Sequence, residues 1–147
     1  MIKIAGIEFQ NVPLLLAPME GVTDPPFRHA CKEQGADVVY SEFISSDGLI
    51  RDAVKSVRKL GFVEEERPFG VQIFGNSIEP MVEAARYAER YNPDIIDINF
   101  GCPVKKVASK GAGSGILTLK AAMEDCVNFD DAVKKGNLSD RMCVELL

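Results

Sequence analysis

Residues 95–106, IIDINFGCPVKK, combine a short apolar run with a cysteine-containing turn and a basic pair. The run 95–98 is typical of a buried strand, and Cys102 follows it in a Gly-Cys-Pro turn. Enzymes with parallel sheets place their reactive groups at the carboxyl ends of strands. Cys102 is therefore a candidate catalytic thiol. The alternative is a cysteine that only packs, because free cysteine is among the most buried residue types.

A buried strand followed by a helix recurs along the chain. Asp24 and Pro25 are typical of a helix start, and Gly35 is a typical stop. Apolar residues at 78, 81, 82 and 85 have the spacing of an amphipathic helix. The predicted strands are residues 14–17, 38–40, 69–74 and 95–98, the first of them buried on both faces; the predicted helices are 24–35, 46–59 and one starting near 78.

This alternation of strand and helix predicts an α/β fold with a parallel sheet and right-handed crossovers. The spacing of about 30 residues per unit fits a (β/α)8 barrel or an open α/β sheet. Four units fit in 147 residues, whereas a whole barrel needs roughly 250. A small hairpin over residues 2–9 is expected to plug the bottom of the larger fold.

The carboxy-terminal part does not continue the alternation. No clear fifth strand follows Leu117, and apolar residues between 119 and 127 form a helical stripe instead. We therefore expect two parts. Residues 1–117 form the N-terminal half of a TIM barrel, and residues 118–147 form a divergent helical tail with short helical pieces up to Leu147.

Composition limits the classes of function. The net charge of −5 argues against a generally basic nucleic-acid surface, although Lys105, Lys106 and Lys110 lie close together. The four cysteines form no C-x-x-C pair and the chain has one histidine, so we expect no metal site. No apolar run approaches the roughly 20 residues of a membrane span, and no signal peptide is visible. These features predict a cytoplasmic protein with reduced thiols.

Two amides near the strand ends are candidate binding residues. Gln72 lies in an otherwise apolar strand, where its amide needs hydrogen-bond partners. Asn99 precedes the Cys102 turn, and its amide offers both a hydrogen-bond donor and an acceptor. The alternatives are a core glutamine satisfied by the protein and a turn-forming asparagine. The glycine-rich residues 111–115 lack the G-x-G-x-x-G pattern, so we give them no phosphate role.

Four motifs in order resemble one enzyme family over roughly residues 2 to 117. They are APMEGVTDPPFR at 17–28, SEF at 41–43, VQIFG at 71–75 and the stretch from Asp97 to Lys110. Each falls at the end of a predicted strand. The chain thereby resembles the tRNA-dihydrouridine synthases.

The resemblance implies an FMN-dependent barrel enzyme that uses NADPH to reduce uridine in tRNA to 5,6-dihydrouridine. In that family the flavin delivers a hydride to C6 of the uracil ring and a cysteine protonates C5. A free thiol is mostly protonated at neutral pH, which suits this role. By resemblance, Cys102 is the acid and Asn99 faces the substrate nucleotide. The resemblance also implies that the flavin is contacted by Pro18, Met19, Glu20 and Gln72. It implies that tRNA phosphates are contacted by Lys105, Lys106 and Lys110. For the lysines a solvated loop is the alternative, and for Pro18 a residue that only ends a strand.

The sequence also departs from the family. The family's later strands carry a lysine and a histidine near the flavin and glycine-rich loops for its phosphate, and a helical domain supplies much of the tRNA surface. None of these is present, so we expect weak or no FMN binding unless a second chain completes the barrel. The first and fourth strands are expected to expose unpaired edges that allow self-association.

Three hypotheses follow. The first is the N-terminal part of an FMN-dependent tRNA-dihydrouridine synthase. The second is a non-catalytic truncated fragment that folds or associates without binding FMN. The third is another FMN barrel enzyme of the dihydroorotate dehydrogenase type, against which the loop at 101–106 and the residues 24–28 speak.

Overall fold

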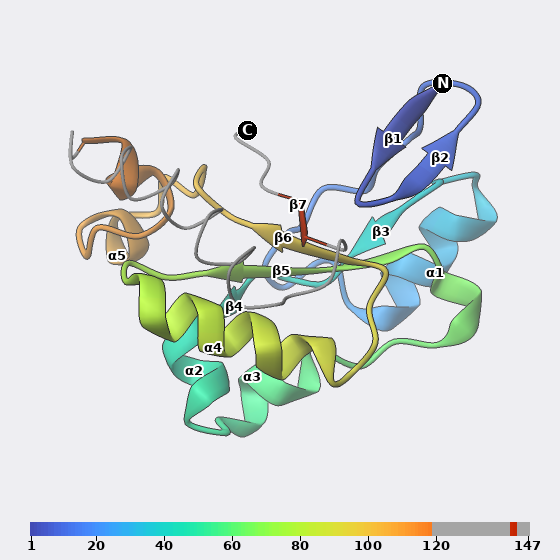
Figure 1. The fold of residues 1–147 in the computed structure, drawn as a ribbon. Helices are drawn as coiled ribbons and strands as arrows, with labels where there is room; N and C mark the ends of the chain where they lie inside the picture. The colour runs from blue at the N-terminus through green and yellow to red at the C-terminus, as the bar shows by residue number, and fades with distance from the viewer. Residues whose placement is uncertain (119–141, 144–147) are drawn as a thin grey trace.

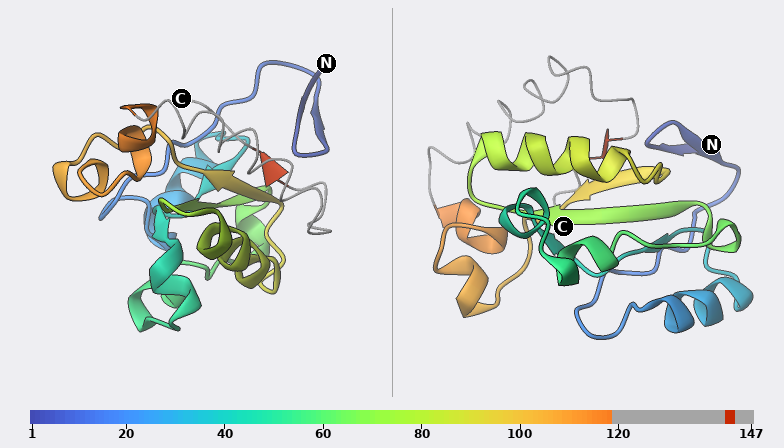
Figure 2. Two further views of the ribbon diagram at one scale, coloured as in Figure 1. Left: turned by 60° about the vertical axis from the view of Figure 1, so that its left-hand side comes forward. Right: turned by 90° about the horizontal axis from the view of Figure 1, so that it is seen from below.

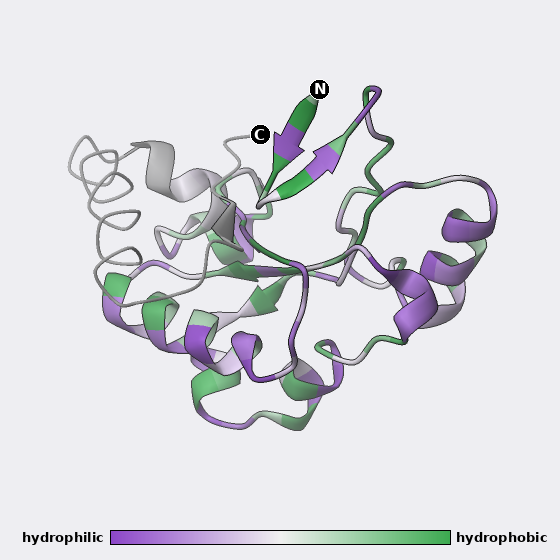
Figure 3. Cartoon of the chain, turned by 45° about the vertical axis from the view of Figure 1, so that its right-hand side comes forward, coloured by the Kyte–Doolittle hydropathy of each residue, from purple (hydrophilic) through white to green (hydrophobic). Residues whose placement is uncertain are grey.

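The computed structural model describes residues 1–118 and 142–143, and shows strands flanked by helices (Figure 1). The hairpin of β1 (Ile2–Ile4) and β2 (Ile7–Phe9) lies by the amino ends of the strands, whereas α5 (Lys105–Ala108) and η2 (Gly113–Thr118) lie by the carboxyl ends (Figure 2). The strands of the sheet are mostly hydrophobic, and α1 is largely hydrophilic (Figure 3). The residues that could form a site therefore gather at the end of the sheet away from the hairpin.

The amino-terminal hairpin is confirmed. Strands β1 (Ile2–Ile4) and β2 (Ile7–Phe9) pair antiparallel. Ala5 and Gly6 join them with φ values of 45° and 84°, the left-handed pair that a tight two-residue hairpin requires. Apolar hairpin side chains pack against Val38, Tyr40 and Ile95, and so cover one face of the sheet near its amino end.

The predicted first strand is only partly confirmed. Leu15 bridges Val38 in parallel, and the Leu16 N–H donates to the Val38 carbonyl at 2.9 Å. Leu14, however, is 66% exposed, so burial on both faces was wrong. Within the described residues this segment borders the sheet along one edge, which leaves its outer side open. Helix α1 (Pro25–Glu33) follows, with Asp24 as its N-cap as predicted.

The parallel sheet is built around β5 (Phe69–Phe74), which the sequence predicts with the same bounds. It pairs in parallel with β3 (Val39–Tyr40), β4 (Ile44–Ser45) and β6 (Ile95–Ile98). Val71, Ile73, Ile96 and Ile98 join the main core, against which α4 packs. The alternate residues of β5 and β6 therefore face the other side of the sheet.

Helix α4 (Ile78–Glu89) confirms the predicted amphipathic helix. Met81 and Ala85 are buried, and Ile78 and Val82 pack partly buried against the core. Short elements complete this part: η1 (Glu64–Glu66), α5 (Lys105–Ala108) and η2 (Gly113–Thr118).

The single helix expected over residues 46–59 was wrong. The structure has two short helices, α2 (Ser46–Ile50) and α3 (Val54–Arg58). Asp52 lies between them with φ 52°, a left-handed conformation that ends a helix and that Asp tolerates better than most residues. The predicted apolar stripe is correspondingly broken, because Leu49 is buried and Ala53 is exposed.

Residues 142 and 143 correct the expectation of short helical pieces near the carboxy-terminal end. Strand β7 (Met142–Cys143) pairs in parallel with β6, opposite Ile96 and Asp97. An open strand edge offers unpaired N–H and C=O groups, which explains why these residues pair there. The fourth strand's outer edge is thus partly covered. The rest of the predicted helical tail, including the stripe at 119–127, lies outside the described residues.

The fold is therefore α/β with a parallel sheet, consistent with part of a TIM barrel. Among the described residues, no helix is long and apolar enough to cross a membrane.

Candidate functional site

A pocket of about 420 Å³ lies at the carboxyl ends of the strands. Its wall is mostly apolar, and its polar side chains are two amides and one thiol, an arrangement typical of small-molecule sites. It brings together Pro18, Gln72, Asn99 and Cys102, which the sequence places at three separate strand ends. The described residues that line it are Ala17, Pro18, Phe43, Gln72, Ile98, Asn99, Phe100, Gly101, Cys102 and Pro103.

Cys102 is held in this pocket by its backbone. Cys102 is 9% exposed, and its backbone N–H donates to Oδ1 of Asn99 at 2.9 Å. The same Oδ1 accepts the N–H of Gly101 at 3.1 Å. Asn99 therefore forms the turn, which was the alternative reading of this residue, while its side chain also lines the pocket.

The far side of the Cys102 loop rests on the glycine-rich segment. The N–H and the hydroxyl of Ser114 both donate to the Cys102 carbonyl at 3.0 Å. A Cβ at Gly113 would lie 2.8 Å from that carbonyl oxygen and 3.0 Å from the Cys102 Cβ. Residues 113–114 are thus a close backbone support for the loop, and glycine at 113 is required by the contact.

Gln72 is connected to Asn99 and to a buried acid. Gln72 itself is 2% exposed. Its Oε1 accepts from Nδ2 of Asn99 at 2.8 Å, and its Nε2 donates to Oδ2 of Asp97. Protein groups therefore meet part of its hydrogen-bonding need, although it also lines the pocket. Asp97 was not predicted as a site residue, and its signal in the sequence was a carboxylate inside an apolar strand.

The segment 18–20 enters the pocket only at its beginning. Pro18 lines the pocket, whereas Met19 and Glu20 are not among the lining residues. The Met19 carbonyl accepts the N–H and the hydroxyl of Thr23, at 3.0 and 3.1 Å, and so closes a turn. The carboxylate of Glu20 binds Nζ of Lys59 at 2.6 Å and is 55% exposed.

A buried ion pair holds the end of the same segment. Arg28 and Glu66 are 2% and 1% exposed, and Nε of Arg28 lies 2.7 Å from Oε1 of Glu66. The guanidinium also donates to the carbonyls of Thr23 and Gly61 at 3.0 Å. This pair ties the loop after Pro18 to η1. Sequence reasoning missed it, because the two residues are far apart in the chain.

The three candidate lysines lie at and after α5, beside the Cys102 loop. Lys105, Lys106 and Lys110 are all exposed. The Lys110 carbonyl accepts from Nδ2 of Asn76 at 2.8 Å, which fixes the backbone near the end of β5. Exposed lysines can contact a polyanion or remain solvated.

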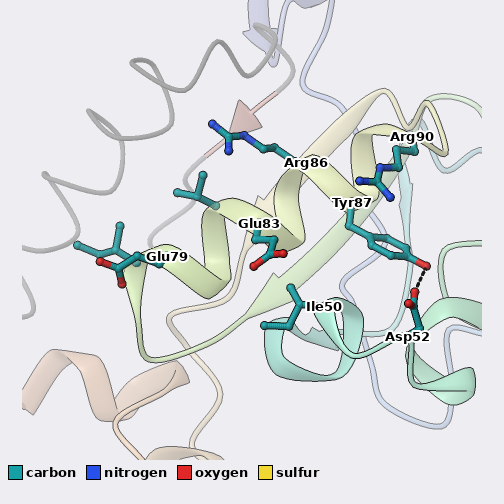
Figure 4. A pocket seen from close by; sticks show the side chains of 9 residues that line it. Ile50, Asp52, Glu79, Glu83, Arg86, Tyr87 and Arg90 are labelled. Atoms are coloured by element: carbon teal, nitrogen blue, oxygen red, sulfur yellow. Dashed lines mark hydrogen bonds between the residues drawn. The ribbon is translucent and has the colours of Figure 1, made fainter.

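A larger groove of about 700 Å³ lies on the outer side of α4, and its lining comes from α2, α4 and the residues beside them (Figure 4). The Tyr87 hydroxyl donates to Oδ1 of Asp52 at 2.7 Å. The pKa of Tyr87 is raised to about 12, mainly by this hydrogen bond and to a smaller extent by burial. None of the lining residues belongs to the Cys102 loop. Among the described residues no group of three or more His, Cys, Asp or Glu is arranged to hold a metal ion.

Comparisons with known proteins agree with the four motifs. A family model for dihydrouridine synthase matches residues 15–136, which extends beyond Leu117. A tRNA-dihydrouridine synthase B of Pseudomonas syringae pv. tomato is 43% identical over 112 residues, or 76% of this chain and 33% of the relative.

Two further relatives show the same partial coverage. The protein of that name from Pseudomonas aeruginosa is 43% identical over 115 residues, 78% of this chain and 35% of the relative. A probable tRNA-dihydrouridine synthase of Aquifex aeolicus is 38% identical over 122 residues, 82% of this chain and 38% of the relative. The chain thus spans about a third of the length of the curated relatives it matches.

Proposed function

Because the chain belongs to the dihydrouridine synthase family, we propose that its pocket serves the FMN-dependent reduction of uridine to 5,6-dihydrouridine in tRNA, with NADPH as reductant. The observation that carries this proposal is the pocket itself. It is lined by Gln72 from β5 and by Asn99 and Cys102, whose loop Asn99 fixes by two hydrogen bonds to backbone N–H groups.

The pocket fits the ring part of a flavin better than its phosphate. The walls include Pro18, Phe43, Ile98 and Phe100, which suit an apolar planar ring. Gln72 provides the amide that would meet the polar edge of the ring. No lysine or arginine is among the lining residues that the structure describes, so these residues offer no cationic side chain to the phosphate. Pro18 and Gln72 are thus the residues proposed to hold the ring, with Met19 and Glu20 adjoining through the loop.

When bound, reduced FMN supplies the hydride that enters at C6 of the uracil ring. The Cys102 thiol supplies the proton at C5, so that Sγ is left as a thiolate and both ends of the C5=C6 bond are saturated. The loop that Asn99 and Ser114 support sets where Sγ stands. Burial of Cys102 among apolar neighbours keeps bulk water from competing as the acid.

Asn99 has one kind of hydrogen bond left for a substrate. Its Oδ1 already accepts two N–H groups, and its Nδ2 donates one of two hydrogens to Gln72. It can therefore donate to a uracil carbonyl but has no acceptor left for the ring N–H. Lys105, Lys106 and Lys110 are proposed to contact the tRNA backbone from the rim of the pocket.

A second candidate is that this chain alone folds or self-associates without binding FMN. The lack of a cationic side chain in the pocket lining favours it for the isolated chain. Adding FMN to the purified chain and following the flavin absorbance separates the candidates, with dihydrouridine then measured in unmodified tRNA after adding NADPH. A flavin-bound chain that forms dihydrouridine supports the synthase. A colourless, inactive chain assigns the isolated chain to the second candidate.

A further inference from the structure

We propose that Asp97 is a positioning residue, whose carboxylate supplies the terminal acceptor of a hydrogen-bond chain that runs through Gln72 and Asn99 to the Cys102 loop. The chain consists of Gln72 Nε2 to Asp97 Oδ2, Asn99 Nδ2 to Gln72 Oε1, and the N–H groups of Gly101 and Cys102 to Asn99 Oδ1. The effect of this hydrogen-bond chain on catalysis rests on the proposed role of Cys102, whereas the hydrogen bonds themselves do not depend on that role.

The strand register places the members of this chain together. Gln72 on β5 is directly paired with Asp97 on β6. Asn99 follows Asp97 by two residues, so both project from the same face of the sheet. This face is opposite to the one where Ile96 and Ile98 meet the main core. The three polar side chains thus line up along the face that leads to the pocket.

The hydrogen-bond chain has one direction, because each of its groups can act only as a donor or only as an acceptor at its position. A carboxylate oxygen accepts, so Asp97 requires the Nε2 of Gln72 on its side. That orientation turns Oε1 of Gln72 toward Asn99, which must then present Nδ2. Oδ1 of Asn99 is thereby left for the N–H groups of residues 101 and 102, which can only donate. A single amide flip at Gln72 or Asn99 would put like groups face to face.

The burial of Asp97 argues for a role of this kind. Asp97 is 3% exposed and Gln72 is 2% exposed, in strands whose other faces are apolar. Apolar side chains of similar size would avoid the cost of desolvating a carboxylate and an amide. A buried polar pair at this position is therefore better explained by the orientation it imposes than by stability alone.

The test uses the full chain without flavin or tRNA, so its outcome is independent of the proposed reaction. Three proteins are compared: the wild type, Asp97→Asn, and the double variant Asp97→Leu/Gln72→Met. Replacing both partners by apolar groups leaves neither a buried carboxylate nor a buried glutamine amide unpaired, so the double variant is expected to fold. The Nδ2 of Asn99, which lines the pocket, then loses its Gln72 acceptor. Asp97→Asn retains an oxygen that can accept from Gln72. Ile96→Ala on the opposite face serves as a destabilised control.

Two readouts report on the loop. One is the alkylation rate of Cys102, mapped by peptide mass spectrometry with Cys31 as internal reference; the other is amide hydrogen exchange in peptides covering 99–104. We expect the double variant to raise both about tenfold, the order expected for losing one or two hydrogen bonds. Asp97→Asn and Ile96→Ala should stay within about twofold of wild type relative to Cys31. Wild-type rates in a folded double variant, or Asp97→Asn as fast as the double variant, would overturn the proposal.

Discussion

At the scale of single residues, the Arg28–Glu66 pair connects the loop after Pro18 to the rest of the fold. Arg28 reaches two backbone carbonyls and both carboxylate oxygens, and its guanidinium lies 4.9 Å from the centre of the Phe69 ring. Breaking such a buried pair leaves a charge without compensation in a low-dielectric surrounding. The pair therefore holds a pocket-forming loop through residues that do not line the Cys102 pocket.

Glu66→Gln should lower the free energy of unfolding by about 3 kcal/mol, because Arg28 would remain buried with a neutral partner. Glu64→Gln is the matched control, since Glu64 lies in the same η1 helix but is 80% exposed. Its effect should stay within about 0.5 kcal/mol. Urea unfolding curves of both variants measure the difference. Equal effects of the two substitutions would show that the buried pair has no special weight.

Gly113→Ala should be more destabilising than Gly21→Ala. Both glycines have positive φ, 54° and 72°, so each substitution carries a backbone cost of about 1 kcal/mol. Only at Gly113 does the new Cβ also meet the Cys102 carbonyl, at 2.8 Å, whereas nothing lies within 4 Å at Gly21. Thermal unfolding of the two variants isolates the contact, and equal melting temperatures would contradict it.

Tyr87 should titrate later than an ordinary tyrosine. Its pKa is raised to about 12, because its hydroxyl donates to the Asp52 carboxylate. The folded state thus holds this proton more tightly than the unfolded chain, whose tyrosine pKa is about 10. This contribution to stability is complete below pH 10 and is lost as the pH rises toward 12.

Asp52→Asn removes the charge that holds the proton. Ultraviolet titration of tyrosinate should then show the late-titrating group of the wild type moving toward the ordinary value. An unchanged titration curve in the variant would show that Asp52 does not cause the shift.

The sequence predicts those site residues whose chemical type is unusual for their position in the chain. Cys102 in a turn and Gln72 in an apolar strand stand out, and both line the pocket. Glu66 does not stand out, and Asp97 stands out only as a carboxylate inside an apolar strand. The sequence does not show the partners of either residue, because only the fold brings those partners near. The flavin contact of Glu20 stays a prediction, and the sequence motif does not show that Lys59 binds its carboxylate.

At the scale of elements, periodicity predicts what long apolar segments do and fails where a single residue breaks the backbone. Helix α4 and strand β5 follow from spacing and burial. The break between α2 and α3 depends on the left-handed Asp52, which no periodicity contains. The apolar composition of residues 14–17 predicts a buried strand. Composition does not show whether another part of the protein covers the second edge of that strand, and Leu14 is exposed.

The two N-caps offer a prediction at this scale. Asp24 accepts the Phe27 N–H at 3.1 Å at the start of α1, whereas Ser77 begins α4 without a side-chain cap bond. Asp24→Ala should cost about 1 kcal/mol and Ser77→Ala well under half of that. Chemical denaturation of the two variants checks it. A larger loss for Ser77→Ala would contradict the capping assignment.

At the scale of the whole molecule, the described residues supply one side of a site. The residues that line the pocket come from the carboxyl ends of the parallel strands. Helix α5 lies at that end of the sheet, and the hairpin lies at the opposite end (Figure 2). The chain spans about a third of its matched relatives, so the reaction is best tested where those relatives supply the remainder.

The most direct measurement is the dihydrouridine content of tRNA treated with a chimeric enzyme. In the chimera, the matched segment of the Pseudomonas aeruginosa relative is replaced by the corresponding 115 residues of this chain. We predict that the chimera, with FMN and NADPH, forms dihydrouridine in unmodified tRNA. We also predict that its Cys102→Ala variant still binds FMN and is reduced by NADPH but forms dihydrouridine far more slowly. A flavin-loaded chimera whose activity is unchanged by Cys102→Ala would contradict the assignment of Cys102 as the proton donor.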